Sequence, residues 1–142
     1  MRLVLPIAVL LAASGCAKKD ELTVTDAVVR LSPNPQAPSA GYFTVRGGPV
    51  ADRLVQVSSP VVTRTEMHQS MTGGGGMSAM KPLDGMDVPA HGVAKFEPNG
   101  RHLMLFNVNP GIKPGNTILM TWTFASGRQV QGQVPVKTPG GL

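Results

Sequence analysis

The sequence predicts an all-β domain, and three observations support this prediction. Apolar and polar residues alternate in short runs, and no run has helical spacing with caps. Seventeen glycines and 13 prolines in 142 residues interrupt these runs and disfavour long helices. The runs recur roughly every 8–12 residues, which is typical of sandwiches and barrels. We therefore expect a β-sandwich or barrel of about eight or nine short, mostly antiparallel strands.

Runs with strand character follow one another along the chain, with turn residues between them. They cover residues 22–31, 42–46, 53–57, 61–69, 77–81, 93–97, 102–108, 117–124 and 129–136. A proline-rich connector occupies 33–38, and a glycine-rich segment occupies 72–76. Because glycine tolerates positive φ, we expect this segment to be the tip of a hairpin. A flexible linker that fixes no register is the alternative.

Composition limits the classes of function. A chain of 142 residues is long enough for one domain with a core, but not for two. Hydrophobic residues make up 42% and charged residues 15%, as in an ordered globular protein. The net charge of +5 is spread over scattered residues, and aromatics are only 4%. This pattern argues against nucleic-acid binding, which needs a basic patch or a stacking platform.

The amino terminus has the features of a lipoprotein leader. A basic start is followed by a short apolar run, residues 3–13, which is too short to span a bilayer. Ala13-Ser14-Gly15-Cys16 resembles a bacterial lipobox, in which cleavage occurs before the cysteine and its sulfur receives lipid. Cys16 is the only cysteine, so no disulfide partner competes for it. An ordinary leader that happens to contain a cysteine is the alternative.

These features divide the chain into four parts. We expect a signal peptide at 1–15, a lipidated cysteine and polar tether at 16–22, a folded domain at 23–137 and a flexible tail at 138–142. The domain would then face the oxidising periplasm from a lipid surface of the bacterial envelope. By resemblance to other lipoproteins, Ala17 after the cysteine favours the outer membrane.

Two histidines and two methionines form the candidate metal site. They are His68, Met80, His102 and Met104. Imidazole and thioether together suit copper, and thioethers favour Cu(I). Seven of the eight methionines lie between residues 67 and 120. For each of them, core packing is the alternative to metal binding.

His102 and Met104 are two residues apart in a predicted strand. They therefore project to one face, and Leu103 and Leu105 project to the other. The strand begins directly after a turn signal at 98–100, so we expect the pair near one end of the sandwich. A histidine that only satisfies its own hydrogen bonds is the alternative.

The glycine tip predicts how the second pair meets. If Met71 faces Met77 across the tip, the numbers of paired residues sum to 148. His68 then faces Met80, with Cβ atoms about 4.5–5.5 Å apart, close enough to share one ion. In this register Met71 points away from His68. Met71 remains an additional candidate ligand, but packing is favoured for it, as for Met67 and Met77.

The four residues resemble the PCuAC family of periplasmic copper chaperones. The family pattern is His or Met, ten residues, Met, 21 residues, His, one residue, Met. Met80 and His102 enclose 21 residues, and one residue separates His102 from Met104. His68 and Met80 enclose 11 residues, one more than the pattern, which the glycine tip can absorb. Further segments resemble the family at 26–30, 52–55, 58–61, 88–90 and 98–105.

This resemblance implies a fold and a function. The fold would be cupredoxin-like, and the four residues would hold Cu(I) near the surface. The ion would pass to the copper centre of cytochrome c oxidase subunit II or to a Sco-type chaperone. We expect a monomeric carrier and not an enzyme. His91 is expected in an exposed turn and Met86 in the core.

The sequence gives less support to two other classes of function, blue-copper electron transfer and hydrolysis. An electron-transfer blue-copper site needs a Cys thiolate, but the one cysteine belongs to the anchor. No nucleophile elbow, His-Glu-X-X-His motif or pair of carboxylates indicates a hydrolase. A structural envelope lipoprotein without metal, or a protein for copper storage or tolerance, remains open.

Overall fold

The computed structural model describes residues 21–72 and 78–140, and within these ranges it contains ten strands and no helix. The strands are β1 (Thr23–Arg30), β2 (Ser39–Arg46), β3 (Asp52–Ser58), β4 (Val62–Thr72), β5 (Ser78–Leu83), β6 (Met86–Val88), β7 (Val93–Phe96), β8 (Arg101–Val108), β9 (Thr117–Phe124) and β10 (Gln129–Lys137). The all-β prediction is confirmed. The number of strands was underestimated because β6, with three residues, is too short to show alternation.

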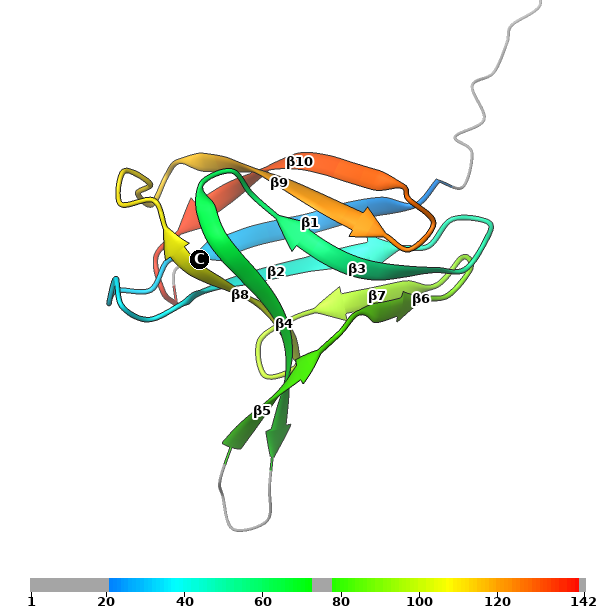
Figure 1. The fold of residues 1–142 in the computed structure, drawn as a ribbon, viewed down its shortest axis with the longest axis horizontal. Helices are drawn as coiled ribbons and strands as arrows, with labels where there is room; N and C mark the ends of the chain where they lie inside the picture. Colours follow the sequence, from blue (N-terminus) through cyan, green and yellow to red (C-terminus); the bar gives the residue numbers. More distant parts are fainter. Residues whose placement is uncertain (1–20, 73–77, 141–142) are drawn as a thin grey trace, which may run out of the picture.

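The strands form two layers that share one continuous order, β5-β4-β8-β2-β1-β10-β9-β3-β6 (Figure 1). β1 and β10 pair in parallel, with Val29 opposite Val136, and connect the two layers. Every other pairing between described strands is antiparallel. β1 is one strand with an irregular register between Thr25 and Val28, where Asp26 has a φ of 55°. This irregularity explains why the run at 22–31 alternates imperfectly.

Aromatic and aliphatic side chains from both layers form the core. Phe43 of β2 stacks on Phe96 of β7 with ring centroids 4.3 Å apart, and Trp122 of β9 meets Phe43 edge-on at 5.5 Å. Leu103 and Leu105 of β8 are fully buried in the same cluster. Met67, Met86 and Met120 also lie in this core, so three methionines are packing residues, as was expected for Met67 and Met86.

β2 changes its partner along one edge. Ser39 to Gly41 pair with β8, whereas Phe43 to Arg46 pair with β7. The turn between β7 and β8 contains Asn99, with a φ of 64°, and is closed by a hydrogen bond from Gly100 N–H to the Glu97 carbonyl. β8 therefore begins directly after this turn, at Arg101, and its pairing with β2 starts two residues later, at Leu103. The predicted position of His102 near a strand end is consistent with this arrangement.

The β4–β5 hairpin projects from the body of the sandwich (Figure 1). At its base, Arg53 of β3 binds two carboxylates that follow β5: its Nη2 lies 2.7 Å from Asp84 Oδ1, and its Nη1 lies 2.6 Å from Asp87 Oδ1. The hydrogen bond to Asp87, followed by the charges of both carboxylates, raises the pKa of Arg53. Gly85 fits this turn because a Cβ there would lie 2.7 Å from the Leu54 carbonyl oxygen.

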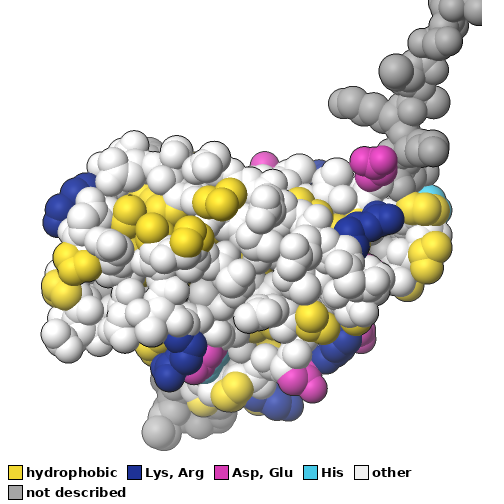
Figure 2. All heavy atoms as spheres, turned by 45° about the horizontal axis from the view of Figure 1, so that its top comes forward, with side chains coloured by type: hydrophobic (Ala, Val, Ile, Leu, Met, Phe, Trp, Pro, Cys, Tyr) yellow, Lys and Arg dark blue, Asp and Glu magenta, His cyan; other side chains and the backbone are white. Residues whose placement is uncertain are grey.

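On the face of the molecule shown in Figure 2, charged side chains are scattered around the margin, and several lysines or arginines lie next to acidic groups. Within residues 21–72 and 78–140, no helix is long and apolar enough to cross a membrane.

Leu103 should be a main determinant of stability because it is fully buried between the two site residues of β8. We expect Leu103→Ala to lower the free energy of unfolding by about 2–5 kcal/mol, measured by urea denaturation. Val50→Ala, at a valine that is 76% exposed, is the control and should change it by less than about 0.5 kcal/mol. A loss below about 1 kcal/mol for Leu103→Ala would contradict the described core.

Candidate metal site

Pairing of β4 with β8 brings two histidines together. His68 of β4 lies opposite His102 of β8, and Met67 lies opposite Leu103. Because side chains alternate along a strand, Met67 and Leu103 enter the core, and both imidazoles lie on the outer face of this layer. The ring centroids are 6.0 Å apart. The structure therefore places both histidines at neighbouring positions of one sheet face.

His102 is held by the turn that precedes β8. The carbonyl oxygen of Gly100 accepts a hydrogen bond from Nδ1 of the imidazole at 3.2 Å, and the Ser70 hydroxyl lies 3.5 Å from the same nitrogen. A backbone hydrogen bond from Ser70 N–H to the Gly100 carbonyl, at 3.0 Å, ties β4 to this turn. The residue is only 8% exposed, so its ring is fixed by packing as well as by hydrogen bonds.

His68 is held by a carboxylate on its own strand. Its Nε2 lies 2.9 Å from Oε2 of Glu66, and Oε1 of Glu66 lies 3.0 Å from Nε of Arg64. The Arg64 guanidinium in turn stacks 4.2 Å from the ring centroid of Phe106. The His68 side chain is 12% exposed. Its ring is therefore oriented by a chain of contacts along the sheet surface.

One nitrogen of each imidazole makes no hydrogen bond to any described residue. Nδ1 of His68 and Nε2 of His102 are buried and have no hydrogen-bond partner among the described residues. A buried polar atom without a partner costs free energy, so such atoms are uncommon in folded proteins. A metal ion bound between the rings would satisfy both nitrogens.

The two methionines lie on the same face as the histidine pair. Each is two residues away from the pair along the strands, in opposite directions. Met104 shares a face with His102 and lies opposite Glu66. Met80 of β5 lies opposite Ser70, which shares a face with His68. Diagonal neighbours of this kind are about 7–8 Å apart and are within reach of long side chains. Met104 is half-buried, whereas Met80 is 59% exposed.

The predicted hairpin register was wrong. His68 faces Pro82 instead of Met80, and Met71 faces Ala79 instead of Met77, so the numbers of paired residues sum to 150. β4 includes Thr72, whose β-branched type favours a strand, and β5 starts at Ser78. In this register, each residue of β4 pairs with a residue two positions further along β5 than predicted. A shift of two preserves the face, so Met80 stays on the side of His68.

The remaining candidates lie elsewhere. Met71 is 50% exposed and has the parity of Met67, so it points away from the histidine face. His91 is an exposed residue of the turn after β6, as expected, with a φ of 54°. Met77 and Cys16 lie outside the described residues.

Sequence reasoning missed the groups that orient the rings. Glu66 and Ser70 each lie two residues from His68, so the alternation of β4 could have placed both beside it. The Gly100 carbonyl had no such signal because any residue carries this acceptor.

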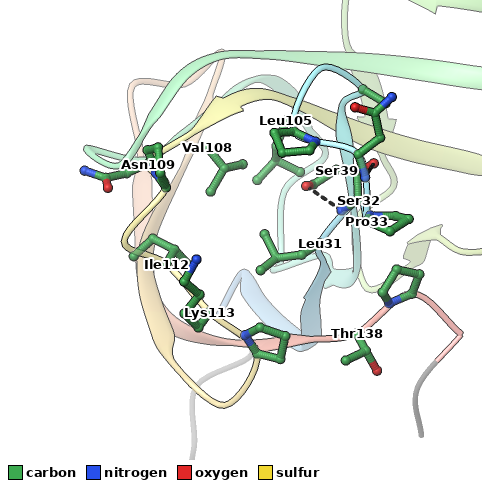
Figure 3. A pocket seen from close by; sticks show the side chains of 16 residues that line it. Leu31, Ser32, Pro33, Ser39, Leu105, Val108, Asn109, Ile112, Lys113 and Thr138 are labelled. Carbon is green, nitrogen blue, oxygen red and sulfur yellow. Dashed lines mark hydrogen bonds between the residues drawn. The ribbon is translucent and has the colours of Figure 1, made fainter.

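One cavity lies apart from these residues. It has a volume of about 430 Å³ and lies at the far end of β8 from His102, between the proline-rich connector and the loop after Val108 (Figure 3). Leu31, Leu105, Val108 and Ile112 form apolar walls, and Lys113 lies at its edge. None of the four candidate ligands lines it.

A family model decides the classification of the chain. The model described as "Putative lipoprotein LpqE-like" matches residues 22–136. The chain belongs to the LpqE-like family. The match includes all four candidate ligands and nearly the whole sandwich.

Single relatives and solved structures are also similar to the chain. A putative lipoprotein of Leifsonia xyli subsp. xyli is 25% identical, and the match covers 92% of this chain and 85% of the relative. The solution structure of CuI-DR1885 from Deinococcus radiodurans is 27% identical, with a TM-score of 0.69, and the match covers 92% of this chain and 87% of that one. The copper-bound PCuAC domain from PmoF2 is 18% identical, with a TM-score of 0.68, covering 83% and 93%.

These similarities confirm the predicted resemblance of this LpqE-like chain to PCuAC domains and its all-β fold. At 18% identity, the PmoF2 domain supports the fold alone. The DR1885 protein extends the similarity over nearly the whole chain.

Engineered disulfides should measure the hairpin register. Pro82 has no N–H, so its pair with His68 is a non-hydrogen-bonded pair of the antiparallel ladder. Ser70 and Met80 form the pair two residues further along, which is therefore of the same type. In such pairs the two Cα atoms lie closer together than in hydrogen-bonded pairs. With Cys16→Ser as background, Ser70→Cys with Met80→Cys should oxidise readily to a disulfide, detected by mass spectrometry after thiol alkylation.

His68→Cys with Met80→Cys is the matched comparison, because these residues are diagonal neighbours at the limit of disulfide geometry. This variant should stay largely reduced under the same conditions. The opposite pattern would support the register with a sum of 148.

Proposed function

We propose that this LpqE-like protein is a Cu(I) carrier of the bacterial envelope. His68, Met80, His102 and Met104 bind the ion on the outer face of the β5–β4–β8 layer. The ion passes to the copper centre of cytochrome c oxidase subunit II or to a Sco-type chaperone that serves it.

One observation carries this proposal. One sheet face carries two buried imidazole nitrogens that have no hydrogen-bond partner in the described part of the chain. A thioether lies two residues away along the strands on each side of this pair. Nitrogen and thioether donors together match the preference of copper, and hard ions such as Mg²⁺ and Ca²⁺ prefer oxygen. The histidine pair is fixed before any ion arrives, which lowers the ordering cost of binding.

The donor types suit transport through an oxidising compartment. A thioether carries no proton to lose, so it is a ligand at any pH, and it does not form a disulfide as a cysteine ligand would. Protons compete with the metal for both imidazoles, so binding weakens as pH falls. Met80, which is largely exposed, is the ligand that a recipient can displace first.

The comparisons support the cargo and the cellular location. The DR1885 structure, similar over 92% of this chain, is that of a Cu(I) form, and the family model and the Leifsonia relative are described as putative lipoproteins. Cys16 would carry the lipid, after a leader at 1–15 and before a tether that ends at residue 22. The domain at 23–137 then faces the periplasm as a monomer, with the outer membrane favoured by Ala17.

Removal of ligands from β8 should abolish copper binding. Cu(I) at 100 times its dissociation constant should stabilise the wild-type protein by about 2.7 kcal/mol, measured by denaturant unfolding under reducing conditions. His102→Ala with Met104→Ala should lose this stabilisation because two of the four donors are gone.

Met71→Ala is the control, since Met71 is an exposed methionine of the neighbouring β4–β5 hairpin that lies on the face opposite the histidines. It should keep the full copper-dependent stabilisation. If the double variant also keeps it, the site assignment is wrong. If the wild type shows no stabilisation, a structural lipoprotein becomes the better description.

Lipid attachment should depend on Cys16. In a bacterial host that processes lipoproteins, Cys16→Ser should abolish the incorporation of labelled fatty acid. The variant should then either appear in the soluble fraction or remain as the unprocessed precursor. Labelling that persists in Cys16→Ser would contradict the anchor, because the chain has no other cysteine.

A further inference from the structure

The two imidazoles at the proposed site are oriented by different kinds of acceptor. A carboxylate of Glu66 holds His68, and a main-chain carbonyl of Gly100 holds His102. Neither acceptor has a proton to donate when the carboxylate is ionised. Each contact therefore determines which ring nitrogen carries the hydrogen in the neutral imidazole.

With an ionised Glu66, the contact of His68 with this carboxylate is a hydrogen bond only when the ring hydrogen lies on Nε2. This nitrogen donates to Oε2 of Glu66 at 2.9 Å, which leaves the lone pair on Nδ1. In His102 the assignment is reversed, because Nδ1 donates to the Gly100 carbonyl at 3.2 Å and leaves the lone pair on Nε2. The two lone-pair nitrogens are the same two atoms that are buried without hydrogen-bond partners among the described residues.

Glu66 is itself held in place. Its second oxygen, Oε1, lies 3.0 Å from Nε of Arg64, and the Arg64 guanidinium rests on the ring of Phe106 at 4.2 Å. Glu66 also lies opposite Met104 in the β4–β8 register, on the same face as the proposed ligands. Because Arg64 holds one oxygen of Glu66, the other oxygen can hold the His68 ring in one orientation.

On the basis of the proposed function, we infer that Glu66 is a positioning residue for the metal and that the ion is bound through Nδ1 of His68 and Nε2 of His102. Glu66 does not bind the metal. It keeps the His68 hydrogen on Nε2 and orients the ring. Outer partners of this kind are typically worth 10–100-fold in metal affinity.

The apo protein tests the hydrogen positions without any metal. Long-range ¹H–¹⁵N correlation spectra of the imidazoles, recorded at mildly alkaline pH, distinguish the two neutral tautomers. We expect the Nε2–H form for His68 and the Nδ1–H form for His102. In Glu66→Ala, His68 should move to a mixture of tautomers, and His102 should be unchanged as an internal control. An Nδ1–H form for His68 in the wild type would overturn the inference.

Metal titrations test the consequence. Glu66→Ala should lower Cu(I) affinity about 10–100-fold in competition with a chromophoric chelator. Glu66→Gln, which keeps an oxygen acceptor, should lose much less. Glu21→Ala removes an exposed carboxylate outside the strands and should have no effect. Unchanged affinity in Glu66→Ala would overturn the positioning role.

Silver(I), a soft ion without redox chemistry, identifies the bound atoms. On its addition we expect the ¹⁵N shifts of Nδ1 in His68 and Nε2 in His102 to change most, and a change at Nε2 of His68 would contradict the inference. A wild-type protein that binds neither ion would refute the proposed function, and the apo spectra would still decide whether Glu66 sets the His68 tautomer.

Discussion

The pairing of β4 with β8 is the contact on which the candidate site depends. It sets His68 opposite His102 on the outer face and Met67 opposite Leu103 in the core. A slip of one residue would place imidazoles in the core and leucines in solvent, so burial of Leu103 and Leu105 locks the register of the site. The hydrophobic core thus fixes the site residues from the opposite side of the same strand.

The four proposed ligands differ in how firmly they are held. The histidines are nearly buried and are fixed by Glu66 and Gly100, and Met104 is half-buried beside them. Met80 is largely exposed on β5, an edge strand at the end of the sheet order. A rigid pair of nitrogens with one accessible thioether fits an ion that must be retained in transit and released on contact. Pro82 on this edge removes a backbone donor and so discourages pairing with another chain.

Much of this arrangement could be predicted from the sequence, for identifiable reasons. Alternation along 102–105 separated the histidine and methionine from the two leucines, and the resemblance to the PCuAC pattern related Met80 to His102. The partner of His68 could not be predicted, because the glycine tip has no side chains that specify a register. Strand order is also absent from local patterns, so the direct His68–His102 pairing emerged only in three dimensions. The alternation of β4 also places Glu66 beside His68, but a carboxylate is not a preferred ligand of Cu(I), so its residue type gives no signal of a copper site.

X-ray absorption at the copper edge, on protein loaded with Cu(I) under reducing conditions, tests the central claim most directly. The described geometry predicts one copper per chain with two nitrogen and two sulfur neighbours. A first shell without sulfur, or a protein that retains no copper, would contradict it.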